Sequence, residues 1–200
     1  VENRTGASGS IGAAYVAKEN RDGYNLLFAT SSMFTTNAVM FKKLAYSLSD
    51  FIPITAVVTY PVVLLVSASQ PIQSVKQLVQ YLKANPQSAN CSGAAGLFQL
   101  GYELFKIQTG TRGEYIAYKS TPQSVNAVMA GEVLMTLADV GPASVAITGG
   151  RVRGLAVTSR ERLASYPNIP TVAEEGFPEL EMGGFMGLLA PAGTPMPIVK

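Results

Sequence analysis

The sequence contains no histidine and only one cysteine, Cys91. Without histidine the chain lacks the commonest general base and the commonest metal ligand, and a Ser-His-Asp catalytic triad is impossible. One cysteine permits no internal disulfide. No carboxylate pair or Cys/His cluster indicates a metal site or a glycosidase, and a Ser-Lys pair using Lys119 is only formally possible. We therefore expect a protein that is not an enzyme and needs no metal or other cofactor.

Strong net charge and long apolar runs are also missing. Fifteen basic and thirteen acidic residues leave a net charge of +2, too near balance for a nucleic-acid-binding surface. No run reaches the roughly 18 to 20 apolar residues that span a bilayer. The first residues, VENRTG, do not include a methionine, so we interpret the chain as part of a longer protein. The absence of a targeting segment is then no argument for the cytoplasm.

The hydrophobic pattern alternates between strand and helix periods, which predicts an α/β fold with mostly parallel sheets. Helices are expected at 11–20, 36–41, 75–84, 97–110, 121–130, 142–148 and 171–175. Strands are expected at 24–29, 52–58, 61–66, 89–92, 114–117, 134–138, 154–158 and 187–190. The last helix is assigned on a capping box, Thr171 followed by Glu174.

The segment VVTYPVV at 57–63 interrupts an apolar strand with Tyr60 and Pro61. Proline lacks the donor that a central strand needs. The segment is either a kinked edge strand or a crossing between two lobes, with FMGLLAPAG at 185–193 as the return. Two crossings give a discontinuous first lobe, 1–60 plus 184–200, and a second lobe at 61–183. That is the topology of a hinged solute receptor.

Five predicted junctions consist of small and hydroxylated residues with hardly a charge: TGASGS at 5–10, ATSSMFTTN at 29–37, CSGAAG at 91–96, YKSTP at 118–122 and DVGPAS at 139–144. Ligands of open α/β sheets bind outside the carboxyl ends of the strands. Free N–H groups at helix N-termini hold anions there without a cationic side chain. The pattern predicts a receptor for a small anionic or polar solute.

Each junction also has a purely structural interpretation. The glycines at 6, 9 and 12 do not follow the dinucleotide spacing and suit a tight turn. Serine and threonine are frequent as plain helix caps, so Ser120 and Thr121 either cap a helix or donate to a ligand. Lys119 either pairs with a carboxylate or is solvated. Asp139 either orders a loop or takes part in binding.

Longer stretches resemble a known family. VENRTGASGSIGAAYVAK, DGYNLLFATSS, YKSTPQSVNAVMAGEV, RGLAVTSRERLASYPNIPTVAEEGFPELE and GLLAPAGTP are similar to the Bug family, the extracytoplasmic solute receptors of tripartite tricarboxylate transporters. PTVAEEG and APAGTP, at matching spacing, are the most specific. The resemblance implies a class II periplasmic-binding-protein fold, in which two α/β lobes surround a cleft that closes on a carboxylate-bearing solute. It also implies that flanking segments complete the first lobe, which is only partial here.

The resemblance further implies a ligand set at matching positions: Thr30, Ser31, Ser32, Ser92, Gly93, Ala94, Ala95, Tyr118, Lys119, Ser120, Thr121 and Asp139. Ala94 and Ala95 replace residues that are more polar in the family, which favours an aromatic or longer aliphatic carboxylate. The implied partners are that small carboxylate and the membrane subunits of a transporter, in the periplasm, with no nucleic acid. An effector-sensing domain of a transcriptional regulator with the same fold is the alternative.

Overall fold

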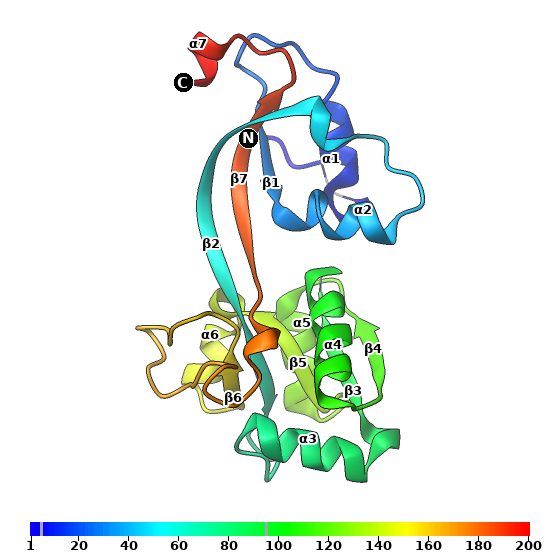
Figure 1. Ribbon diagram of the computed structural model, residues 1–200, viewed down its shortest axis with the longest axis vertical. Coiled ribbons are helices and arrows are strands. Elements are labelled where there is room, and N and C mark those ends of the chain that lie inside the picture. The colour runs from blue at the N-terminus through cyan, green and yellow to red at the C-terminus, as the bar shows by residue number, and fades with distance from the viewer. Residues whose placement is uncertain (5, 95) are drawn as a thin grey trace. The chain divides into compact units, whose positions relative to one another are not determined.

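The computed structural model describes residues 1–4, 6–94 and 96–200. The chain forms two compact units (Figure 1). Unit 1 comprises Val1–Thr59 and Gly184–Lys200, and unit 2 comprises Tyr60–Gly183. Two strands, β2 (Phe51–Ser67) and β7 (Gly183–Pro191), contribute residues to both units.

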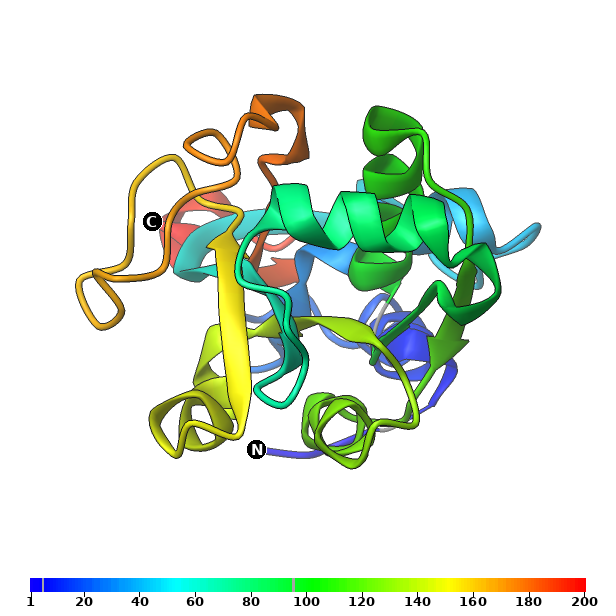
Figure 2. The same cartoon turned by 90° about the horizontal axis from the view of Figure 1, so that it is seen from below.

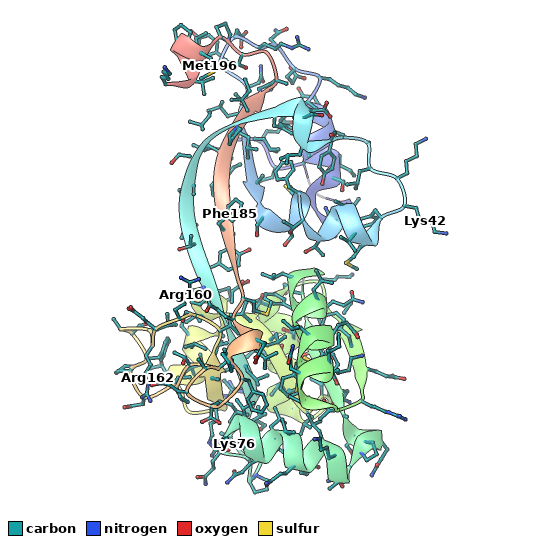
Figure 3. All side chains as sticks on the ribbon, viewed as in Figure 1. Lys42, Lys76, Arg160, Arg162, Phe185 and Met196 are labelled. Atoms are coloured by element: carbon teal, nitrogen blue, oxygen red, sulfur yellow. The ribbon has the colours of Figure 1, made fainter. Side chains whose placement is uncertain are left out.

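The α-helices of unit 1 are α1 (Ser10–Val16), α2 (Thr36–Met40) and α7 (Met196–Val199), and the unit also contains strand β1 (Leu27–Thr30). β1 pairs antiparallel with β7, so that Leu27 lies opposite Leu189. The buried core includes Ala13, Leu27, Ala29, Tyr46, Phe51 and Leu189. Apolar side chains are also exposed in this unit, among them Leu26, Phe28, Val57 and Phe185, the last labelled in Figure 3.

Unit 2 is an α/β unit that also contains the strands β3 (Asn90–Gly93), β4 (Glu114–Ala117), β5 (Met135–Asp139) and β6 (Val152–Val157). Its helices are α3 (Val75–Ala84), α4 (Gly96–Thr109), α5 (Thr121–Ala130) and α6 (Val140–Thr148). The expected parallel pairing holds for β3 with β4 and for β3 with β5. β2 runs antiparallel to both β5 and β6, so the sheet is mixed.

The strand expected to break at Pro61 is continuous from Phe51 to Ser67. The pairing of β2 with β5 begins at Val62, and its pairing with β6 begins at Val63. Pro61 lies just before these ladders, so its missing N–H group leaves no gap in either of them. A proline at that point is therefore compatible with an unbroken strand.

The second half of β2 is buried on both faces of the sheet. Val62, Leu64 and Val66 belong to the core that α3 and α4 cover, with Leu78 and Tyr102. Val63 and Leu65 belong to the core under α5 and α6, with Val128 and Ala143. Figure 2 shows α3 and α4 on one side of this sheet and α5 and α6 on the other. Burial on both faces explains why the sequence here is a continuous apolar run.

The helix predicted at 171–175 is wrong, because the segment forms only a turn. The capping box is present: the Glu174 N–H donates to Thr171 Oγ1 at 3.1 Å, and the Thr171 N–H donates to Glu174 Oε2 at 2.7 Å. Gly176 follows at once with a φ of +92°, which ends the turn. One turn fixes several residues for a single backbone bond, so a capping box alone does not produce a helix.

Arg153 on β6 fastens the loop between β2 and α3. Its guanidinium donates to the carbonyl oxygens of Gln70 at 2.9 Å, Ile72 at 2.7 Å and Ala68 at 3.3 Å. Because hydrogen bonds from charged donors are the stronger kind, we expect Arg153→Ala to lower the free energy of unfolding by about 2 kcal/mol. Urea denaturation measures this, with Arg151→Ala as the control, since Arg151 is exposed. Equal midpoints for the two variants would contradict the assignment.

Two further arginines, unlike Arg153, form exposed ion pairs with glutamates. Arg160 pairs with Glu181 and Arg162 pairs with Glu174, and both arginines are marked in Figure 3. These pairs are solvent-exposed and contribute little to stability.

Among the described residues, every helix is too short or too polar to cross a membrane.

Candidate functional site

The carboxyl ends of β3, β4 and β5 lie at one edge of the unit 2 sheet, because β3 runs parallel to both of the other strands. The predicted ligand residues of this unit follow these three ends. Gly93 ends β3 and Ala94 follows it, residues 118–121 follow β4, and Asp139 ends β5. The Tyr118 N–H donates to the Gly93 carbonyl at 2.9 Å, which joins the first two loops. Residues separated by more than 40 positions are thus brought to one edge by strand direction alone.

The turn before α5 presents one buried and one half-buried hydroxyl. Ser120 occupies the N-cap position, but its side chain makes no capping bond. Thr121 is 6% exposed, and its hydroxyl donates to Asp139 Oδ2 at 3.2 Å rather than to the backbone. Lys119 beside them is exposed. The Ser120 and Thr121 side chains therefore do not cap α5, which was one of the two roles proposed for them.

Ser92 has a different surrounding from the other predicted residues. It is fully buried, and its hydroxyl donates to the Ser124 carbonyl at 3.2 Å. Thr136 in turn donates to the Ser92 carbonyl at 2.8 Å, and the Thr136 and Ser124 hydroxyls lie 3.3 Å apart. This polar cluster ties β3, β5 and α5 together inside the core. Neither Ser124 nor Thr136 could be identified from the sequence, because both lie within apolar periodic segments.

Gly93 allows the backbone after β3 to approach its neighbours closely. A Cβ atom at Gly93 would come within 2.5 Å of the Tyr115 hydroxyl and 2.7 Å of the Phe98 Cβ. A side chain there would therefore collide with Tyr115 of β4 and Phe98 of α4. Ala94 is half-buried, whereas Ala95 lies outside the described residues.

Burial raises the pKa of Asp139, and the hydrogen bond from Thr121 offsets part of this rise. The folded state then binds the proton more tightly than the unfolded state does. The stability from this group is complete below the unfolded pKa and is lost as the pH rises through the folded pKa. We expect Asp139→Asn to flatten this decline while keeping an acceptor for Thr121. Unfolding free energies of both proteins between about pH 4 and 7 measure it, and an identical pH profile would contradict it.

In unit 1 the predicted loop is a single 3-10 turn, Ser31–Met33, directly after β1. Thr30 is half-buried, and Ser31 and Ser32 are 7% and 9% exposed. The Ser31 Oγ accepts a hydrogen bond from the Phe185 N–H of β7 at 3.3 Å. Because that bond occupies a lone pair, the hydroxyl proton of Ser31 stays available for donation.

A pocket of about 440 Å³ lies beside this turn, wholly within unit 1. Polar and apolar atoms share its wall about equally; the lining is Met33, Phe34, Ala38, Phe41, Lys42, Leu44, Tyr46, Ser47 and Leu48. It includes none of the predicted ligand residues. The described residues contain no group of three or more His, Cys, Asp or Glu side chains placed to hold a metal ion.

Comparisons with known proteins identify the family to which this fold belongs. The family model described as tripartite tricarboxylate transporter family receptor matches residues 1–200. A UPF0065 protein of Bordetella bronchiseptica is 34% identical over all of this chain and 59% of its own length. The structure of Rpa4515 from R. palustris with adipate aligns at a TM-score of 0.91, with 33% identity over 99% of this chain and 67% of that one.

A second solved structure is MatC from Rhodopseudomonas palustris with bound malate. It aligns at a TM-score of 0.86, with 27% identity over 99% of this chain and 68% of that one. The expected periplasmic-binding-protein fold is thereby confirmed. The chain spans about 60% of the length of the curated relatives that it matches. With a match over its whole length, the chain belongs to the tripartite tricarboxylate transporter receptor family, the Bug-type solute receptors.

Proposed function

We propose that this protein captures a small carboxylate and delivers it to the membrane subunits of a tripartite tricarboxylate transporter, and that it works in the periplasm without catalysing a reaction. Family membership supports the receptor role. Two relatives of solved structure contain adipate and malate, both dicarboxylates. The observation that carries the proposal is the edge of unit 2 where three loops with few charges follow parallel strands.

That edge has the chemistry to recognise a carboxylate without an ion pair. The Ser120 hydroxyl makes no capping bond, and the α5 helix begins at the next residue. Free N–H groups in a first helical turn attract anions through the helix dipole. Lys119 is the exposed cation of this loop. The Thr121 hydroxyl donates to one oxygen of Asp139 and so fixes the orientation of this carboxylate.

The solute class is testable with the full-length protein. A thermal-shift series with succinate, malate, adipate, citrate, benzoate and aspartate separates chain length, charge and aromatic character. A ligand at 100 times its dissociation constant adds about 2.7 kcal/mol to stability, which such a scan resolves readily. We expect a dicarboxylate or a longer monocarboxylate to give the largest shift. The absence of a shift with every carboxylate, together with one for a sugar, would overturn the proposal.

The salt dependence of binding tests how the carboxylate is held. Dipoles at short range are screened less than exposed ion pairs. If neutral donors dominate, affinity measured by calorimetry changes little between about 0.05 and 0.5 M salt. A steep loss of affinity would identify Lys119, the exposed cation of the loop after β4, as the main contact. Lys119→Gln should then abolish the salt dependence.

A further inference from the structure

Two turns of unit 1 are tied together by a buried polar network. The side-chain amide of Asn37, at 2% exposure, donates to the Ser8 carbonyl at 3.0 Å. The same nitrogen lies 3.3 Å from the Tyr46 hydroxyl. Tyr46 in turn donates its hydroxyl proton to the Met33 carbonyl. The network therefore joins the turn at 6–10 to the turn at 31–33, which carries predicted ligand residues.

The turn at 6–10 needs an external restraint. Ala7 and Ser8 adopt φ values of +46° and +52°, in the left-handed region, and Gly6 and Gly9 beside them are also positive. Left-handed backbone costs a residue with a side chain about 1–2 kcal/mol. Such conformations persist only where the surroundings fix them. The bond from Asn37 to the Ser8 carbonyl is a side-chain contact that restrains this turn.

The turn at 31–33 is restrained from both ends. Its first carbonyl, that of Ser31, accepts the N–H groups of Phe34 and Thr35. Its last carbonyl, that of Met33, accepts the Tyr46 hydroxyl. The Tyr46 ring packs edge-to-face against Phe34 and Phe51 at centroid distances of 6.0 and 6.3 Å. The ring is thus held rigidly, and its hydroxyl fixes the end of the turn.

We infer that Asn37 and Tyr46 are positioning residues for the solute site: they hold the 6–10 and 31–33 turns in one fixed arrangement, so that Ser31 and Ser32 present their donors without reordering. A site whose donors are already placed binds more tightly because it does not lose conformational entropy on binding. The inference rests on the proposed function for its effect on affinity. Its effect on the two turns is independent of any solute.

The first test uses full-length protein without solute. Hydrogen exchange should rise in peptides covering 6–10 and 31–35 in Asn37→Ala, and should stay unchanged in β1 and β7. Ser8→Gly added to that variant should recover part of the protection at 6–10, because glycine adopts a positive φ without strain. Asn20→Ala is the matched control, since Asn20 is an exposed asparagine in the same unit. If hydrogen exchange rises over the whole of unit 1, Asn37 stabilises the unit in general and not these two turns, and the inference is wrong.

The second test measures affinity for the carboxylate that gives the largest thermal shift. Loss of one or two neutral hydrogen bonds should weaken binding by about 2- to 10-fold in Tyr46→Phe and by about 10-fold in Asn37→Ala. Tyr46→Phe keeps the aromatic packing, so it remains informative if Asn37→Ala folds poorly. In a Ser31→Ala background, Tyr46→Phe should cost much less than it does alone, because it acts through that turn. Full additivity would overturn the positioning role.

The two failures are distinguishable. If the wild-type protein binds no carboxylate, the proposed function fails, while the exchange experiment still decides whether the network fixes the two turns. If the wild-type protein binds and both variants bind equally well, the positioning role fails and the proposed function stands.

Discussion

Gly113→Ala should lower the free energy of unfolding by about 2–5 kcal/mol, the combined effect of overpacking and a left-handed backbone. Gly113 lies between α4 and β4 with a φ of +156°. A methyl group there would overlap the Ala89 carbonyl and the Tyr102 hydroxyl. Neither atom can move easily. Ala89 accepts the Glu114 N–H at 3.0 Å, and Tyr102 is fully buried.

Gly131→Ala provides the control for this substitution. Gly131 ends α5 with a φ of +77°, and no atom lies within 4 Å of the position that its Cβ would occupy. The control should cost only the backbone strain, about 1–2 kcal/mol. Urea denaturation of both variants separates the free-energy cost of the steric clash from that of the backbone strain. If Gly113→Ala is no less stable than Gly131→Ala, the close approach of β4 to the Ala89 carbonyl is not as described.

Periodicity predicted the helices of unit 2 well. The ranges 75–84 and 121–130 match α3 and α5, and 114–117 matches β4. These segments combine an apolar stripe with a Ser74 cap, a proline in the first turn or a glycine at the end, so local and tertiary preferences agree. The helix expected at 11–20 stops at Val16 as α1. There the apolar pattern is weaker.

Local pattern was a poor guide where pairing partners decide the outcome. Nothing in VVTYPVV reveals that the ladders with β5 and β6 begin just after Pro61, so the strand was expected to break. The direction of β2 relative to β5 is likewise a property of the whole sheet. At 171–175 a correct capping box led to an incorrect helix, because Gly176 ends the segment after one turn.

In the candidate site, too, some features follow from the local sequence and others depend on tertiary packing. Placing the loops at strand ends needed only the order of strands and helices. The contact between Thr121 and Asp139, and the burial of Ser92, depend on side-chain packing between elements distant in sequence. Asn37 and Tyr46 gave no sequence signal that connects them to Ser8 or Met33, since no short spacing or motif links these positions.

Ser120 and Thr121 should behave differently when each is replaced by alanine. The Ser120 side chain makes no capping bond, so Ser120→Ala should leave stability nearly unchanged. If its hydroxyl donates to the solute, affinity should fall by about 10-fold, as expected for one hydrogen bond to a charged acceptor. Thr121→Ala should lower stability by about 1 kcal/mol, because a buried hydrogen bond to Asp139 is lost.

Thr121→Ala should also weaken carboxylate binding. Without the Thr121 hydroxyl, the Asp139 carboxylate loses the hydrogen bond that fixes its orientation and is free to turn toward the solute. Thr121→Ser is the matched control, since it keeps the hydroxyl and should restore most of the affinity. Calorimetry at neutral pH compares the three variants with the wild type. Unchanged affinity in Ser120→Ala and Thr121→Ala alike would remove this turn from the binding site, and would leave the loop after β3 and the unit 1 turn to supply the donors.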